Sequence, residues 1–570
     1  MSEEQPEAPA PDTGTSGASW NTTASDPSDA DDGGHFELFF GYRDEAAYAA
    51  QVEHLVADRF ASRLAAKDHT LWGQAAEEES AKRLGWVDLS VTSRPLVDEV
   101  TALRDELHAK GLTRVVLCGM GGSSLAPEVI CGAAGVDLDV LDSSDPDFVR
   151  AAIDKDLAHT VVVVSSKSGG TVETDSQRRA YEKAFADAGI DARERFVVVT
   201  DPGSPLDSSA SEAGYRVFRA DPSVGGRFSA LTAFGLVPCG LAGADIAGLL
   251  DEAEAIRPAL EADAVGNPGL RLGALIGVAN LAGVDKLVLC NADAPYSGFG
   301  DWAEQLIAES TGKDGKGVLP VIVESPTSPN FAPSSADEVL GSFGPGWLFD
   351  DVRTKSGWGV SVDAALGAQM LLWEHATAVA GAIIGINPFD QPDVESAKTA
   401  ARGLLDGGGA QPTPAFSDGP ITVYASPGWL SDSVSAVHEA ITELLAGLDP
   451  QHGYVAVQAY LDRHRDGALA DVRSTIAAAT ERPVTFGWGP RFLHSTGQYH
   501  KGGPATGVYL QVTSQPERDL AVPDRPFTFH EFLMAQAVGD GQVLADKGRP
   551  VLRLHLDSPA DLDAVRQALQ

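Results

Sequence analysis

The chain has 570 residues, 43% of them hydrophobic and 22% charged, which is the balance of a globular protein with more than one domain. Acidic residues outnumber lysine and arginine by 81 to 42, which gives a formal net charge of −39. This charge repels phosphate backbones and anionic lipid, and it therefore argues against nucleic-acid partners and against membrane-surface binding.

The four cysteines, Cys118, Cys131, Cys239 and Cys290, form no CxxC pair and show no spacing typical of metal ligands. They argue against a disulfide scaffold and a structural zinc site, and they fit a reducing cytoplasm. The N-terminal sequence lacks the basic and apolar regions of a secretory signal. We find no uninterrupted apolar run of about 18 residues, so no membrane-spanning segment is expected.

Residues 1–34 are predicted to form a disordered acidic leader. They contain eight acidic residues and no lysine or arginine, and they are rich in Ser, Pro, Ala, Gly and Thr. Such a segment cannot bury enough apolar surface to offset the entropy lost on ordering. Residues 35–112 are predicted to be a mainly helical segment, because apolar residues recur there at three- and four-residue spacing.

From residue 113 the pattern changes to short β-branched runs, each followed by glycines and an amphipathic stretch, which predicts parallel sheets covered by helices on both faces. The first three runs are 114–118, 161–165 and 196–200, and a second set comprises 286–290, 318–323, 454–458 and 484–488. We therefore expect an α/β fold with two doubly wound domains. Their predicted bounds are 113–255 and 256–530, the second with a helical insertion over 360–405 and a hinge at Gly407–Gly409, followed by an α/β extension at 531–570.

Two of the predicted strands end in loops rich in glycine and serine. Residues 119–124 (GMGGSS) follow the first strand, and residues 166–171 (SKSGGT) follow the second and open a helix predicted near Val172. Glycines allow close approach of a ligand, hydroxyls donate hydrogen bonds, and a helix N-terminus favours negative charge. This combination predicts a cradle for one phosphate. Ordinary connecting loops remain an alternative, as does a dinucleotide site, because Asp142 lies about twenty residues beyond the first glycine.

Arg227 follows two glycines and precedes an apolar run, so it is expected at the edge of buried structure, where it can stabilise an oxyanion or a phosphate. On a predicted helix, Gln305, Glu309 and Lys313 share one face. The alternative interpretation of Glu309 and Lys313 is an exposed i,i+4 ion pair, which would contribute only a few tenths of a kcal/mol, about 0.2–0.5.

Lys398 lies in the middle of an apolar stripe on a helix that begins near Asp390. An inward lysine titrates readily, but its stem can also follow the apolar stripe with the charge in water. Two histidines, His494 and His500, occupy a glycine-rich loop after an apolar strand, where an imidazole can transfer protons near neutral pH. We expect no metal site there, because the spacing indicates no third ligand.

Taken together, six segments resemble the phosphoglucose isomerase family, and most closely the form found as the C-terminal part of transaldolase/phosphoglucose isomerase fusion proteins. They cover roughly residues 95–510. About a hundred residues precede them, too few for a transaldolase barrel, so transaldolase activity is not predicted. The matching segments are GMGGSSLAPE (119–128), SKSGGTVET (166–174), VGGRFSALTAFGLVP (224–238), EQLIAESTGKDGKG (304–317), GINPFDQPDVESAK (385–398) and HSTGQYHKGG (494–503).

The resemblance implies two sugar-isomerase (SIS) domains and an enzyme that interconverts glucose 6-phosphate and fructose 6-phosphate through a cis-enediol(ate). It implies no metal or organic cofactor. One carboxylate suffices to move the proton between C2 and C1, because the neighbouring carbonyl makes the α-hydrogen acidic.

The family's functional roles carry over to named positions of this chain. Glu309 is implied to be the base, Arg227 to stabilise the enediolate, and Lys398 with a histidine to open the sugar ring. Substrate-binding roles are implied for a further set: Gly122, Ser123, Ser166, Lys167, Ser168, Thr171 and Gln305.

The histidine element departs from the better-known members of the family, because here it follows Lys398 in the sequence. We favour His494 over His500 as the ring-opening histidine. In the family this histidine can come from the partner subunit, so the resemblance implies a homodimer.

Three rival functions remain at the level of the sequence. The enzyme could also accept mannose 6-phosphate, for which Thr232 lies in a segment that could tune specificity. A non-catalytic SIS-domain sugar-phosphate sensor is the second, although a sensor would need only the phosphate loops and not Glu309, Arg227, Lys398 and His494. A dehydrogenase is the third.

Overall fold

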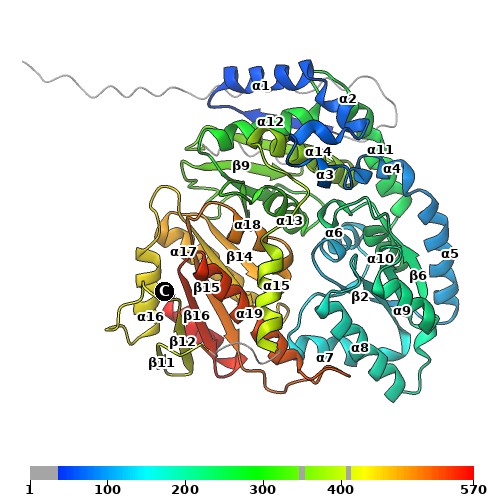
Figure 1. The fold of residues 1–570 in the computed structure, drawn as a ribbon, viewed down its shortest axis with the longest axis vertical. Helices are drawn as coiled ribbons and strands as arrows, with labels where there is room; N and C mark the ends of the chain where they lie inside the picture. The colour runs from blue at the N-terminus through cyan, green and yellow to red at the C-terminus, as the bar shows by residue number, and fades with distance from the viewer. Residues whose placement is uncertain (1–35, 346–353, 406–411, 570) are drawn as a thin grey trace, which may run out of the picture.

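The computed structural model describes residues 36–345, 354–405 and 412–569, and its strands form three sheets (Figure 1). The predicted acidic leader at 1–34 and the predicted hinge at Gly407–Gly409 lie outside the described residues. The predicted α/β class with parallel sheets is confirmed. Among the described residues, no helix is long and apolar enough to cross a bilayer.

The N-terminal segment is helical, as predicted, except for a strand at its start. This strand, β1 (Phe36–Gly41), joins a sheet formed more than 240 residues later. Asp44 caps the first helix by accepting a hydrogen bond from the Ala47 backbone amide, the arrangement expected at a helix N-terminus. The helices are α1 (Glu45–Ala57), α2 (Phe60–Ala65), α3 (Glu77–Ser80), α4 (Leu89–Thr92) and α5 (Pro95–Ala109).

The first α/β unit is a five-stranded, wholly parallel sheet in the order β3-β2-β4-β5-β6. Alternate valines of its central strand β4 pack into two different hydrophobic clusters, one on each face, which explains the unbroken valine run. Its strands are β2 (Arg114–Gly119), β3 (Asp139–Leu141), β4 (Thr160–Ser165), β5 (Phe196–Thr200) and β6 (Arg216–Arg219). Its helices are α6 (Leu125–Ala134), α7 (Pro146–Asp154), α8 (Val172–Asp187), α9 (Pro205–Ala213) and α10 (Ala233–Ala242).

The second unit has the strand order β1-β10-β9-β7-β8, in which only β1 runs antiparallel to its neighbour. Its other strands are β7 (Lys286–Asn291), β8 (Leu319–Val323), β9 (Glu338–Phe343) and β10 (Gly359–Ala364). Its helices are α11 (Ile246–Glu261), α12 (Pro268–Leu281), α13 (Phe299–Thr311) and α14 (Leu366–Ile384).

The third unit is a six-stranded sheet in the order β11-β12-β16-β15-β13-β14, parallel from β16 to β14. Its strands are β11 (Phe416–Asp418), β12 (Ile421–Ala425), β13 (Tyr454–Tyr460), β14 (Val484–Trp488), β15 (Gly507–Ser514) and β16 (Val551–Leu556). Its helices are α15 (Val394–Leu405), α16 (Val437–Ala446), α17 (Val472–Thr480), α18 (Gly497–Gly502), α19 (Phe529–Asp546) and α20 (Leu562–Ala568).

The second set of predicted strands does not form a single sheet. Segments 286–290 and 318–323 belong to the second sheet, whereas 454–458 and 484–488 belong to the third. The predicted domain 256–530 therefore contains parts of two sheets. Strand β16, placed in the predicted extension at 531–570, lies between β12 and β15 inside the third sheet. A run of valine and leucine predicts a buried strand but carries no information about its pairing partner.

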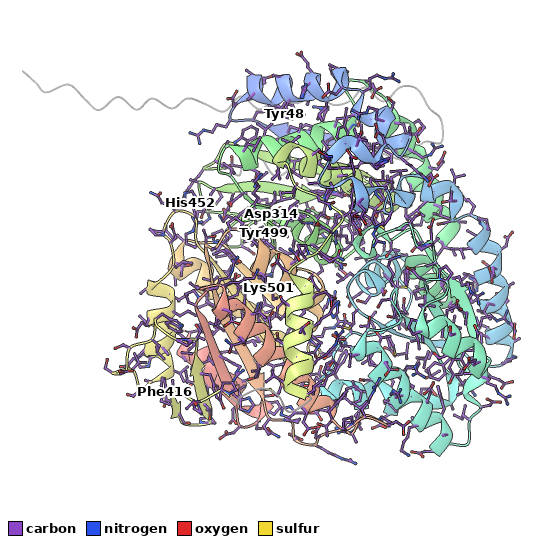
Figure 2. All side chains as sticks on the ribbon, in the orientation of Figure 1. Tyr48, Asp314, Phe416, His452, Tyr499 and Lys501 are labelled. Carbon is purple, nitrogen blue, oxygen red and sulfur yellow. The ribbon has the colours of Figure 1, made fainter. Side chains whose placement is uncertain are left out.

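An aromatic and aliphatic cluster joins the second and third units. Val288 and Leu319 of the second sheet pack there with Tyr454 and Tyr509 of the third. Tyr499 of α18 belongs to the same cluster (Figure 2). Leu544 of α19 belongs to the same cluster, and α15 packs along α19 (Figure 1). These packed junctions fix the loops that carry the predicted site residues.

Candidate active site

The two predicted phosphate loops leave the first sheet side by side. Gly119 at the end of β2 pairs with Ser165 at the end of β4, so both loops lie at the carboxyl edge of the sheet, where ligands of parallel sheets bind. Residues Gly121–Ser123 form a short 3-10 helix there. A Cβ on Gly122 would lie 1.9 Å from the Gly226 carbonyl oxygen, so only glycine permits this contact with the loop that carries Arg227.

The loop 166–171 forms the predicted hydroxyl-rich turn before α8. Ser166 Oγ lies 3.0 Å from Thr171 Oγ1, and Ser168 Oγ accepts a hydrogen bond from the Gly170 amide at 3.2 Å. Lys167 Nζ instead forms an ion pair with Asp201 at 2.7 Å. This loop therefore has hydroxyls and a helix N-terminus available to an anion, with the Lys167 charge held by a neighbouring carboxylate.

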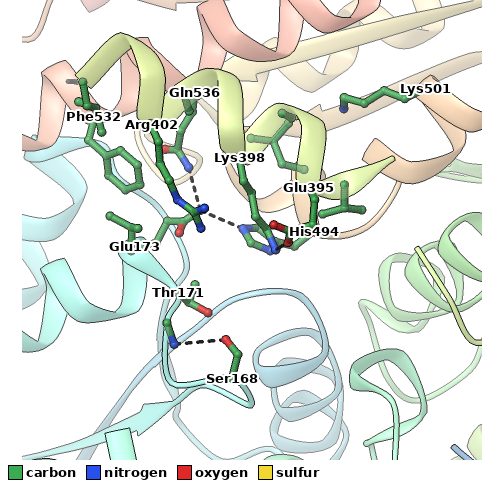
Figure 3. Close-up of a pocket in the computed structure, with 17 residues that line it drawn as sticks. Ser168, Thr171, Glu173, Glu395, Lys398, Arg402, His494, Lys501, Phe532 and Gln536 are labelled. Carbon is green, nitrogen blue, oxygen red and sulfur yellow. Dashed lines mark hydrogen bonds and ion pairs between the residues drawn. The ribbon is translucent and has the colours of Figure 1, made fainter. Parts of the chain in front are cut away.

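A cavity of about 290 Å³ lies between this loop and helices α15 and α19 (Figure 3). Ser168 and Thr171 line one side, and Lys398 and His494 line the other. Of the two interpretations of Lys398, the structure fits the one in which the stem follows the apolar stripe and the charge remains in water. Its side chain is 41% exposed and its Nζ contacts Glu395 Oε1 at 2.8 Å, so the charge faces the cavity.

His494 is held by an acidic residue that the sequence analysis missed. Its Nε2 lies 2.9 Å from Glu173 Oε1, which also accepts a hydrogen bond from Gln536 Nε2 at 2.7 Å. Burial raises the pKa of Glu173, but the charge of His494 and its hydrogen bond outweigh burial and leave that pKa below its usual value. The available signal was position, because Glu173 is the penultimate residue of the motif at 166–174 and lies in the first turn of α8.

His500 lies in a different environment from His494. It is 2% exposed, its Nδ1 lies 3.1 Å from the Tyr454 hydroxyl, and its ring stacks on that of Tyr454. Burial lowers the pKa of His500 well below its usual value, which favours the neutral imidazole. Of the two histidines, only His494 lines the cavity.

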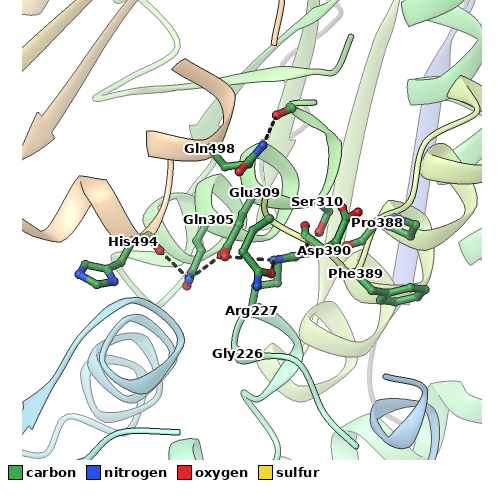
Figure 4. A network of polar contacts seen from close by, with 12 residues as sticks. Gly226, Arg227, Gln305, Glu309, Ser310, Pro388, Phe389, Asp390, His494 and Gln498 are labelled. Atoms are coloured by element: carbon green, nitrogen blue, oxygen red, sulfur yellow. Dashed lines mark hydrogen bonds and ion pairs between the residues drawn. The ribbon is translucent and has the colours of Figure 1, made fainter. Parts of the chain in front are cut away.

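Arg227 and Glu309 form a buried ion pair at the junction of the units (Figure 4). Arg227 Nη1 lies 3.0 Å from Glu309 Oε1, and Gln305 Nε2 donates to Glu309 Oε2 at 3.1 Å. Two donors therefore orient the carboxylate. The remaining donors of Arg227 reach Ser310 Oγ, Gln391 Oε1 and the carbonyls of Pro388 and Asp390.

The alternative interpretation of Glu309 and Lys313 as an exposed ion pair is wrong. Lys313 is 2% exposed and contacts Asp390 Oδ1 at 2.7 Å and the Asn387 carbonyl at 2.6 Å. Burial, with the nearby positive charge of Arg227, lowers the pKa of Lys313 to about 8 although Asp390 opposes this. The two residues therefore have different partners: Lys313 pairs with Asp390, and Glu309 pairs with Arg227.

His494 joins the two clusters. Its imidazole lines the cavity, while its backbone carbonyl accepts a hydrogen bond from Gln305 Nε2 at 2.7 Å. Glu309 and Arg227 do not line that cavity, so the structure places the predicted base one residue layer beyond it. Gly121 of the loop 119–124 packs closely against Gln305, because a Cβ on Gly121 would lie 2.8 Å from Gln305 Nε2.

Asp142 and Thr232, which the sequence offered for alternative functions, have partners within the protein. Asp142, required by the dinucleotide alternative, is 1% exposed and pairs with Arg491 at 2.8 Å. The Thr232 hydroxyl caps α10, accepting from the Phe234 amide and donating to the Ser229 carbonyl. Among the described residues, no group of three or more His, Cys, Asp or Glu side chains is arranged to hold a metal ion.

Known proteins share this fold. A crystal structure of a hypothetical protein from Thermus thermophilus is 26% identical, with a TM-score of 0.56 over 65% of this chain and 99% of that one. A glucose-6-phosphate isomerase from Chlamydia trachomatis has a TM-score of 0.52 at 20% identity, over 65% of this chain and 88% of that one, which shows likeness of fold.

Sequence relatives point to one family. The family model described as phosphoglucose isomerase matches residues 96–327. A probable glucose-6-phosphate isomerase from Natronomonas pharaonis is 29% identical over 394 residues, covering 59% of this chain and 89% of that protein. A glucose-6-phosphate isomerase from Levilactobacillus brevis is 30% identical over 319 residues, covering 46% of this chain and 70% of that protein. The chain belongs to the phosphoglucose isomerase family.

Proposed function

We propose that this protein is an isomerase that interconverts D-glucose 6-phosphate and D-fructose 6-phosphate through a cis-enediol(ate). The observation that carries the proposal is the oriented Glu309 carboxylate, paired with buried Arg227. It is connected through Gln305, His494 and Glu173 to the first turn of α8, which follows the hydroxyl-rich loop. A sugar-phosphate sensor would need the loop but would have no use for a buried carboxylate held in one orientation.

The hydroxyl-rich loop is suited to the substrate's phosphate group. Ser168 and Thr171 line the cavity, and the Ser166 hydroxyl contacts the Thr171 hydroxyl. Helix α8 begins directly after this loop, at Val172. The free amides and positive end of α8 favour an anion at this position, even in a protein whose net charge is strongly negative. We assign backbone contacts to Lys167, Gly122 and Ser123 on the same edge.

Ring opening is assigned to Lys398 and His494, which lie on the cavity wall opposite the phosphate loop. This step moves a proton from the C1 hydroxyl to the ring oxygen O5, so it needs groups that donate and accept at nearly neutral pH. When the Nε2–H of neutral His494 donates to Glu173, its Nδ1 is left as the acceptor. Glu173 is thus a positioning residue for His494.

Isomerisation is assigned to Glu309. Its carboxylate removes the proton from C2 of the open-chain aldose and returns it to C1, while a proton passes from O2 to O1, so that atoms and charge balance. All five N–H donors of Arg227 have partners in the structure. Arg227 therefore stabilises the enediolate as a fixed positive charge, which a low-dielectric site makes effective.

We propose a chain of the type found at the C-terminus of transaldolase fusions, since HSTGQYHKGG follows Lys398. We also propose a cytoplasmic homodimer. The four free, buried cysteines support a cytoplasmic location, and the family resemblance implies the dimer. The contact between His494 and Glu173 lies within one chain, so that contact needs no partner subunit. Sedimentation velocity tests the dimer directly.

A coupled assay tests the proposed activity. Fructose 6-phosphate is supplied, and formation of glucose 6-phosphate is followed with and without EDTA. We expect turnover in the range common for enzymes, about 1–10³ per second, unaffected by the chelator. Binding of sugar phosphate without any conversion would contradict the proposal and favour the sensor.

A further inference from the structure

A second cavity, of about 420 Å³, lies in the third α/β unit. Its wall includes His530, Met534 and Val538 of α19, whereas Phe532 and Gln536 of the same helix line the first cavity. Leu405 at the end of α15 lines both cavities. The paired helices α15 and α19 therefore separate the second cavity from the candidate active site (Figure 1).

Arg553 of β16 is the notable polar group on this wall. The residue is 6% exposed, and its guanidinium carbon lies 4.3 Å from the centre of the Tyr424 ring. Among the described residues, its guanidinium has neither a hydrogen-bond acceptor nor a carboxylate partner, and its Nε is wholly enclosed. Buried guanidinium groups are normally paired, because an isolated charge is costly to remove from water.

Two histidines line the wall near Arg553. His555 lies two residues further along β16, on the same face, and His530 faces it from the first turn of α19. Burial, together with the charges of Arg553 and His530, lowers the pKa of His555 to about 4. The Nδ1 of His530 is buried without a partner in the part of the chain that the structure describes.

The carboxylates near this cavity have other roles. Glu531, on the wall, closes the N-terminal cap of α19 by accepting from the Thr528 amide at 2.8 Å. Asp519, which faces His530, accepts from the amides of Leu520 and His530. Asp557 faces His555 rather than Arg553. The cavity thus keeps an unneutralised cation in a chain with 81 acidic residues.

Apolar side chains also line the cavity, with Leu404, Phe527 and Met534 among them. We propose that this cavity binds a small organic anion: a phosphate monoester or a carboxylate on an apolar or aromatic body. Its oxygens accept hydrogen bonds from Arg553, in the charge-assisted geometry that guanidinium groups favour. Its body packs against α19 and the end of α15, the helix that carries Lys398. The proposal is independent of the isomerase chemistry, since it uses none of the residues assigned to that reaction.

A crystallographic soak locates the ligand without any substitution. Crystals of the wild-type protein are soaked with 4-bromophenyl phosphate, and the bromine is found from its anomalous scattering. We expect a bromine peak among the apolar side chains near Phe527, with the phosphate within hydrogen-bond distance of Arg553. A peak in the first cavity with none in the second would overturn the proposal.

Calorimetry measures the role of charge in solution. The Ser166→Ala/Thr171→Ala protein is the background, because it removes the proposed phosphate cradle. We expect it to bind phenyl phosphate or benzoate better than neutral benzyl alcohol, and the better of the two anions identifies the head group. Arg553→Met should weaken the anion at least about tenfold. Arg566→Met is the matched control, since this arginine is an exposed residue of the same unit, and it should change nothing.

Two results of the titration would contradict the proposal: equal affinity for benzyl alcohol, or unchanged anion affinity in folded Arg553→Met. If that variant does not fold, Arg553→Lys keeps the charge but not the planar guanidinium, and it should bind the anion more weakly than the wild type. The wild-type soak decides the location in either case.

Discussion

Single residues show most clearly what a sequence can and cannot reveal about this site. The hydroxyls of the 166–171 loop are recognisable because serine, glycine and a helix start are local features. The partner of Glu309 is not local. Its spacing of four from Lys313 indicated an ion pair, but Arg227, 82 residues away, takes the carboxylate. Helical spacing places two residues on one face without saying what packs against that face.

At the residue scale, Ser166→Ala/Thr171→Ala should weaken substrate binding more than the proton-transfer step. Each hydroxyl lost is a donor to a charged acceptor, worth about 1.5–3 kcal/mol. We expect KM for fructose 6-phosphate to rise strongly while kcat falls less. Ser208→Ala, at an exposed position on α9, is the control and should match the wild type. An unchanged KM with a collapsed kcat would show that the loop does not bind the phosphate.

At the scale of elements, seven strands lie where the sequence predicted them, but the division of the second set between two sheets was not predicted. The runs at 114–118, 161–165 and 196–200 became neighbouring strands of one sheet, because each is followed closely by its own crossover helix. Strand β16 has an Arg and a His between leucines, so it lacked the pattern of a buried strand although its leucines are fully buried. Strand β1 pairs with β10 across more than 300 residues, a contact that no local pattern specifies.

Helix α8 links the phosphate loop to His494 through Glu173, and this contact predicts a pH dependence. The pKa of Glu173 is lower in the folded protein than its ordinary value, so the stabilisation is present above the ordinary value, about pH 4.3. This stabilisation is lost as the pH falls through the pKa that Glu173 has in the folded protein. Glu173→Gln should therefore lower the melting temperature at pH 7, and the difference from wild type should shrink below about pH 4.

The control for Glu173 is Glu395→Gln, which removes a carboxylate that is 65% exposed on the opposite wall of the cavity. Its melting temperature should follow the wild type at each pH, because exposed ion pairs contribute under about 1 kcal/mol. If the difference in melting temperature between Glu173→Gln and the wild type stays constant from pH 7 to pH 3, the contact with His494 is not the cause of that difference.

At the scale of the whole molecule, a cluster of charges holds the three units together around the site. Arg491 of the third unit contacts Glu128 at 2.6 Å and Asp142 at 2.8 Å, both in the first unit, and Asp301 of the second unit at 3.7 Å. Burial raises the pKa of Glu128, but Arg491 and Arg463 reverse this and lower it to about 2. Since His494 lies three residues after Arg491, the same cluster positions the histidine.

Arg491→Met should therefore lower both stability and turnover. Removing one partner of a buried ion pair typically costs about 3–5 kcal/mol, although Arg463 remains beside the carboxylates and reduces the loss. We expect a clear fall in melting temperature and a lower kcat, with partial recovery in Arg491→Lys. Arg193→Met removes an exposed pair and should be neutral in both measurements. A stable Arg491→Met protein with full turnover would show that the units are held together elsewhere.

The central claim is that Glu309 moves the proton between C2 and C1. Glu309→Gln keeps the size of the side chain and can still hydrogen-bond, but it removes the proton acceptor. The measurement is exchange of the substrate's C2 hydrogen with solvent deuterium, followed by NMR in protein whose melting temperature is verified. We predict that exchange falls by at least about 10²–10⁴-fold, the usual contribution of a positioned base. Exchange at the wild-type rate in folded Glu309→Gln would contradict this account of the mechanism.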